Sequence, residues 1–160
     1  MTGPVFVASD VLLAARDRDQ PLKRTRARAW LEMLSGHRLG RTSTLVLAEY
    51  YVRATNNRRL GISARDAWED VKHYFDWSPL TLDAELMAEA RAVQQRHRLS
   101  WRDSTVVAAA RMQACVLLLT DELRDGASYG TLAVRSPFTL DVEQPRARYD
   151  VQGWATATPH

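Results

Sequence analysis

The chain has 160 residues, of which 46% are hydrophobic, and its formal net charge is +3. This length and apolar content suffice for one globular domain with a substantial core. Only Lys23 and Lys72 among the 22 basic residues are lysines, and arginine is the better partner for phosphate groups. An arginine-leaning composition of the host explains this bias equally well.

The sequence excludes internal disulfide bonds, because Cys115 is the one cysteine and it lies within an apolar run. A reducing cell interior suits such a chain. The first residues lack the pattern of a signal peptide, and no apolar run reaches the ~20 residues that span a bilayer. We therefore expect a soluble, cytoplasmic protein with no membrane partner.

An apolar run at residues 4–7 opens the chain and is followed by Ala8, Ser9 and Asp10. A run without polar alternation is typical of a strand inside a parallel sheet that is covered on both faces. We predict a short helix over residues 11–15, capped by Asp10. Ligand sites in such sheets lie beyond the carboxyl ends of the strands, so these three residues mark a candidate site.

Strand and helix patterns alternate along the rest of the chain. We predict helices over residues 22–34, 44–52, 63–75, 84–96 and 100–110, and strands over residues 38–43, 79–82, 115–120 and 131–135. This order favours an α/β fold, a three-layer α/β/α sandwich with a central, mostly parallel sheet. Residues 1–138 are predicted to form a single domain, and residues 139–160 a partly irregular C-terminal tail.

Four acidic residues stand out by their positions. Glu49 shares a helix face with apolar residues, where an unpaired carboxylate is costly, although a glutamate at the edge of that face could bend into water. Asp103 lies in a first helical turn, where a capping role is the structural alternative. Asp121 and Asp125 follow the second apolar strand, so all four could converge at one edge of the sheet.

Several carboxylates crowded together repel one another unless a cation lies among them. All-oxygen ligands favour Mg²⁺ or Mn²⁺. Zinc is disfavoured because Cys115 stands alone and the histidines are scattered at positions 37, 73, 97 and 160. The chain also lacks the Gly-x-Ser-x-Gly elbow of serine hydrolases and a Walker phosphate loop.

Together these motifs resemble the PIN-domain family, and within it the VapC-type ribonuclease toxins of bacterial toxin-antitoxin pairs. The resemblance covers nearly the whole chain. Its motifs, in order, are VFVASDVL at residues 5–12, LVLAE at 45–49, LSWRD at 99–103, LTDELRDG at 119–126 and SPF at 136–138. Each is weak alone, but four or more in the family's order are specific.

The resemblance implies catalytic and metal-binding roles for Glu49, Asp103 and Asp121. It places Ser9 at the family's hydroxyl position and makes Asp125 or Glu122 an outer member of the site. In that family, an Mg²⁺ or Mn²⁺ ion activates a water molecule that attacks an RNA phosphodiester.

One departure from the family pattern bears on activity. Ala8 stands where the family carries its first metal-binding aspartate. Asp10 lies about two residue rises further, ~7 Å along an extended strand, and is a poor substitute unless the turn folds back. We therefore expect a catalytically impaired chain, through either an introduced or a natural change of aspartate to alanine.

The resemblance also implies partners: an RNA substrate, a cognate antitoxin that crosses the acidic cleft, and a second copy in a homodimer. An alternative is a non-catalytic module that binds RNA or the antitoxin, with phosphate contacts from arginines 16, 53, 58 and 59. Residues 50–52, Tyr149 and Trp154 are candidate contact surfaces. A phosphoacceptor receiver domain is disfavoured, because neither lysine follows a late strand.

Overall fold

The computed structural model describes residues 3–142, and its centre is a five-stranded sheet in the order β2-β1-β3-β5-β4. Strands β2, β1, β3 and β5 run parallel, and β4 is antiparallel to β5. The bounds are Val5–Val7 for β1, Gly40–Arg41 for β2, Leu117–Leu119 for β3, Ser128–Tyr129 for β4 and Leu132–Arg135 for β5. The predicted α/β class with a mostly parallel sheet is confirmed.

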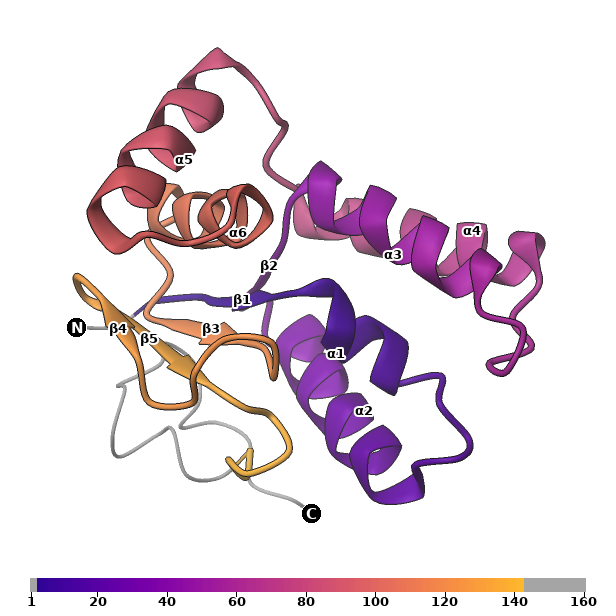
Figure 1. Ribbon diagram of the computed structural model, residues 1–160. Coiled ribbons are helices and arrows are strands. Elements are labelled where there is room, and N and C mark those ends of the chain that lie inside the picture. The colour runs from indigo at the N-terminus through magenta and orange to yellow at the C-terminus, as the bar shows by residue number, and fades with distance from the viewer. Residues whose placement is uncertain (1–2, 143–160) are drawn as a thin grey trace.

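Helices flank this sheet, with α5 and α6 on one side and α1 and α2 on the other (Figure 1). Helices α3 and α4 pack together beside α1. The bounds are Ser9–Ala14 for α1, Pro21–Gly36 for α2, Thr44–Asn56 for α3, Ala64–Tyr74 for α4, Ala84–His97 for α5 and Trp101–Met112 for α6, and a 3-10 turn, η1, covers Phe75–Trp77. No helix among residues 3–142 is long and apolar enough to cross a membrane.

The two apolar strands form the centre of the core. All three residues of β1 and all three of β3 are fully buried, and the strands pair in register from Val5 with Leu117 to Val7 with Leu119. Both therefore end at the same edge of the sheet. The residues that follow them, Ala8 and Thr120, are brought side by side there.

The helix starts follow the capping residues in the sequence. The side-chain oxygens of Ser63, Asp83 and Ser100 each accept a hydrogen bond from the backbone N–H three residues on. The prediction that Asp10 caps α1 is wrong. The helix begins at Ser9, Ala8 occupies the capping position without a side-chain bond, and Asp10 lies in the first turn.

The short elements at the sheet edges differ from the prediction. Residues 79–82 form no strand: Leu80 makes an isolated parallel bridge to Ser43. Strand β2 is only Gly40–Arg41, and β4 was not predicted. Pieces of two residues are too short to show a period, so side-chain patterning cannot reveal them.

The folded unit continues past Phe138. Leu140 is buried, its backbone N–H donates to the Ser136 carbonyl, and its carbonyl accepts a hydrogen bond from the Trp30 indole. The rest of the predicted tail, including Tyr149 and Trp154, lies outside the described residues.

Candidate active site

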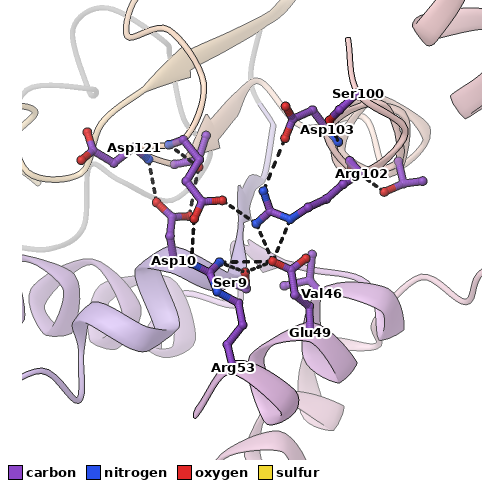
Figure 2. A network of polar contacts seen from close by, with 12 residues as sticks. Ser9, Asp10, Val46, Glu49, Arg53, Ser100, Arg102, Asp103 and Asp121 are labelled. Atoms are coloured by element: carbon purple, nitrogen blue, oxygen red, sulfur yellow. Dashed lines mark hydrogen bonds and ion pairs between the residues drawn. The ribbon is translucent and has the colours of Figure 1, made fainter. Parts of the chain in front are cut away.

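The candidate site lies where β1 and β3 end and where α3 and α6 approach that edge (Figure 2). Ser9 and Asp10 begin α1, and Asp121 follows β3. Glu49 comes from the second turn of α3, and Asp103 from the first turn of α6. The fold therefore brings together residues far apart in the chain, as the hydrogen bond between Asp10 and the Asp121 backbone, 111 positions apart, shows.

Glu49 is held by three side chains that all donate to its Oε1 atom. Ser9 Oγ lies 2.9 Å away, Arg53 Nη1 3.2 Å, and Arg102 Nε 2.8 Å. Burial by itself would raise the pKa of Glu49, but the hydrogen bonds from Arg102 and Ser9 outweigh it and hold the pKa below its ordinary value. Glu49 is thus a partly buried, ionised carboxylate.

The two arginines also bridge Glu49 to Glu122. Arg53 Nη2 donates to Glu122 Oε1 at 2.9 Å, and Arg102 Nη2 donates to the other oxygen of Glu122. The result is a closed arrangement of two glutamates and two guanidinium groups. Each negative charge in this group already faces two positive charges, which is the role that a divalent cation would otherwise serve.

Asp103 lies at the start of α6, at the rim of this arrangement. Its backbone N–H donates to Ser100 Oγ at 3.0 Å, which is the predicted capping interaction. Its carboxylate lies 3.6 Å from Arg102 Nη1 and is mostly buried. The structure therefore gives Asp103 both its capping position and a place beside the cleft.

Asp10 folds back toward β3. Its carboxylate accepts hydrogen bonds from Thr120 Oγ1 at 3.0 Å and from the Asp121 backbone N–H at 2.7 Å. Burial raises the pKa of Asp10 to about 6, although these hydrogen bonds oppose the shift. The carboxylate ties the end of β1 to the end of β3, and Figure 2 shows it apart from Glu49.

Asp121 and Asp125 do not join the group around Glu49. The Asp121 side chain is about half exposed and lies 3.8 Å from Lys23 Nζ. Asp125 accepts hydrogen bonds from Arg135, the Ser136 backbone and Thr139. Burial opposes ionisation there, but these bonds lower the pKa of Asp125. It stabilises the loop around β5 and lies away from the cleft.

Ala8 offers no side-chain oxygen at the end of β1. It is buried, with 4% of its surface exposed, and its N–H donates to the Leu119 carbonyl. Among residues 3–142, no three histidine, cysteine or acidic side chains are placed to hold one metal ion. In this arrangement Arg53 and Arg102 occupy Oε1 of Glu49 and both oxygens of Glu122, so these three oxygens are already bound to guanidinium groups.

Sequence reasoning missed Arg102 and gave Glu122 only an outer place. The contact between Glu49 and Arg53 could be predicted from the sequence, since residues four apart share one helix face. The bonds from Arg102 to Glu49 could not be predicted, because they depend on how closely α3 and α6 approach. Glu122, rather than Asp121, is the acid after β3 that bonds the arginines around Glu49, whereas both acids line the cavity beside Asp10.

Comparison with known proteins places this geometry in a family. The PIN domain model matches residues 5–124, whereas no curated protein matches. The FitAcB structure from Neisseria gonorrhoeae superposes with a TM-score of 0.59 at 20% identity, over 85% of this chain and 99% of that one. A toxin-antitoxin complex from Klebsiella pneumoniae gives 0.56 at 17% identity, over 83% and 97%.

A third similar structure is the sarcin-ricin loop cleaving toxin VapC20 of Mycobacterium tuberculosis. Its TM-score is 0.53 at 20% identity, and the match covers 71% of this chain and 86% of that one. At such identities these structures establish the shared fold. Because the family model spans well over half of the sequence, this chain belongs to the PIN domain family.

Proposed function

We propose that this chain is the toxin of a toxin-antitoxin pair, an RNA-cleaving PIN protein that is impaired in Mg²⁺- or Mn²⁺-dependent hydrolysis. The family and the similarity to toxin structures support the general class. The proposed impairment rests on the arrangement of side chains in the cleft. Ala8 supplies no carboxylate at the tip of β1, and Arg53 and Arg102 bind both glutamates.

In an unimpaired site, the bound cation would lower the pKa of a water molecule and stabilise the charge that develops on the phosphate. The residues here supply parts of that environment. Glu49 is ionised, and Asp103 contacts the same Arg102 side chain from the first turn of α6, where a helix N-terminus favours anions. An aspartate at position 8 would add the oxygen ligand that the strand tip lacks.

Cleavage of single-stranded RNA in Mn²⁺ by the present chain and by Ala8→Asp tests this proposal. We expect weak or undetectable cleavage by the present chain and a gain of at least about 100-fold in Ala8→Asp, the scale set by a general acid-base or ligand group. The double variant Ala8→Asp with Asp103→Asn should lose the gain. Equal cleavage by the chain and Ala8→Asp would overturn the assignment of Ala8 as the disabling residue.

The proposed antitoxin partner has a suitable surface beside the cleft. An apolar groove of about 690 Å³ is lined by Leu45, Val52, Leu82 and Trp101, and it reaches Glu49 at one end. Val52, Leu82 and Trp101 are each at least 40% exposed, and apolar exposure next to a charged cleft is typical of a protein contact.

Affinity for the cognate antitoxin, measured by titration calorimetry, should fall in Val52→Asp, because a charge would be buried in the groove. Met87→Asp on α5 is the matched control, since Met87 is also about half exposed but lies outside the groove. Equal affinity of Val52→Asp and the parent chain would refute this docking surface. The homodimer stays a prediction, which light scattering of the purified protein can check.

A further inference from the structure

A second polar pocket lies between the start of α2 and the loop before α4. It has a volume of about 390 Å³, and five of its ten lining residues are arginines: 16, 18, 24, 28 and 59. Asp19 and Asp66 are the acids in its lining. Five positive and two negative charges leave a formal charge of +3 around one small pocket.

Two of these arginines are neutralised by acids. Arg16 makes a bidentate contact with Asp70, at 2.9 and 2.6 Å. Arg59 bonds both oxygens of Asp17, at 2.8 and 3.0 Å, and also Asp19 at 3.0 Å. These pairs hold the walls of the pocket in place. When Asp17 and Asp70 are counted with Asp19 and Asp66, five arginines face four acids, and Asp66 is the acid in the lining that faces the other three arginines.

The remaining arginines have donors to spare. Arg28 uses only its Nε, which donates to the Ala15 carbonyl at 2.9 Å. Among the described residues, the side chains of Arg18 and Arg24 take part in no hydrogen bond or ion pair, and Arg24 Nε is buried without an acceptor. A buried donor without a partner is costly and rare. With unused guanidinium donors on three arginines that line one pocket, the pocket has the chemistry of an anion site.

The arginine-lined pocket lies next to the cavity at the edge of the sheet. Arg59 and Leu60 line it, and they also line the neighbouring cavity that contains Asp10, Asp121 and Glu122. The two cavities thus adjoin at residues 59–60. A strand that lies in the first cavity would pass beside the arginine-lined pocket.

The acids in the cleft repel a phosphate backbone, so affinity for RNA needs positive charge beside the cleft. Guanidinium groups bind phosphate oxygens with two parallel hydrogen bonds. We propose that Arg18, Arg24 and Arg28 bind a backbone phosphate of the RNA strand whose adjoining segment lies in the acidic cleft. This inference rests on the proposed RNA substrate and assigns the residues that hold it.

The test is fluorescence anisotropy of a labelled single-stranded RNA with the present chain, whose Ala8 limits cleavage, at several salt concentrations. Arg18→Ala with Arg24→Ala should weaken binding roughly tenfold per arginine. The slope of log K against log salt should also fall in magnitude by about one unit per lost contact. The matched control is Arg91→Ala with Arg96→Ala, which removes two exposed arginines from α5.

Each outcome decides a separate claim. Equal RNA binding by the pocket variant and the parent chain would overturn the inference and leave the proposed function standing. Absence of RNA binding in every protein would overturn the RNA substrate, and this inference with it. If inorganic phosphate raises the melting temperature of the parent chain but not of the pocket variant, while RNA does not bind, the pocket takes a free anion and the RNA assignment is wrong.

Discussion

Glu49 is the residue around which the cleft is arranged, and Arg102 is its strongest partner. Arg102 donates through two nitrogens to Glu49 and also contacts Glu122 and Asp103. We predict that Arg102→Ala lowers the free energy of unfolding by about 1–2 kcal/mol at neutral pH, because two partly buried carboxylates lose a charged donor. Urea denaturation measures this, with the exposed Arg96→Ala as a control that should change nothing.

The same experiment shows whether the contacts of Arg102 contribute to the stability of the fold. If Arg102→Ala were as stable as the parent chain, Arg53 and Ser9 alone would satisfy Glu49. The closed arrangement of two glutamates and two arginines would then contribute nothing to folding.

Asp10 makes the stability of the folded protein depend on pH, and the direction of this dependence follows from its pKa. Its pKa is about 6 in the folded chain, against an ordinary value of 3.8. Between these values the folded state binds more protons than the unfolded state, so this group makes stability fall as pH rises through that window. The full cost, at most about 3 kcal/mol for two pKa units, is present above pH 6.

Asp10→Asn should therefore raise the melting temperature at pH 7.5 and have little effect below pH 4, because the neutral amide keeps an acceptor for the Asp121 N–H. Thermal unfolding of both proteins at the two pH values measures the difference, and all other titrating groups are common to both. A lower melting temperature for Asp10→Asn at pH 7.5 would mean that the hydrogen bonds to the carboxylate outweigh its burial.

At the scale of elements, β2 depends on a close approach that only glycine permits. A Cβ atom built at Gly40 would lie 2.5 Å from the ring of Trp77, which η1 places over the strand. We predict that Gly40→Ala costs about 1–3 kcal/mol, the usual range for overpacking a core. Denaturant unfolding with Gly36→Ala as the control checks this.

The control is expected to move in the opposite direction. Gly36 is the last residue of α2, and a Cβ there meets nothing within 4 Å. Alanine at position 36 should stabilise the helix by roughly 0.5–1 kcal/mol. Destabilisation by both substitutions to the same extent would show that the Trp77 contact is not the cause.

The long helices and the two buried strands could be predicted because their signals are local. Apolar spacing and capping serines act within a few residues, as Ser63 and Ser100 show. The strand over residues 131–135 was predicted as well, but β4 could not be, since two residues carry no period. The prediction that Asp10 caps α1 is wrong because its carboxylate bonds the end of β3 across the sheet.

In the molecule as a whole, the sequence indicated that acids gather at the sheet edge, but it did not indicate that Glu122 joins Glu49 or how their charge is balanced. The order of the motifs predicted the family, and the family model confirms it. The places of Glu49 and Asp103 follow from the fold. Arg102 is 53 positions from Glu49 and 20 positions from Glu122 in the chain. No local sequence pattern encodes contacts over such separations.

We infer that Ala8 and the two arginines together weaken cation binding in the cleft. Titration of Mn²⁺, followed by electron paramagnetic resonance of the free ion, tests it without relying on activity. We expect weak binding by the present chain, tighter binding by at least about tenfold in Ala8→Asp, and loss of that gain when Glu49→Gln is added. Equally tight binding by the present chain and Ala8→Asp would contradict it.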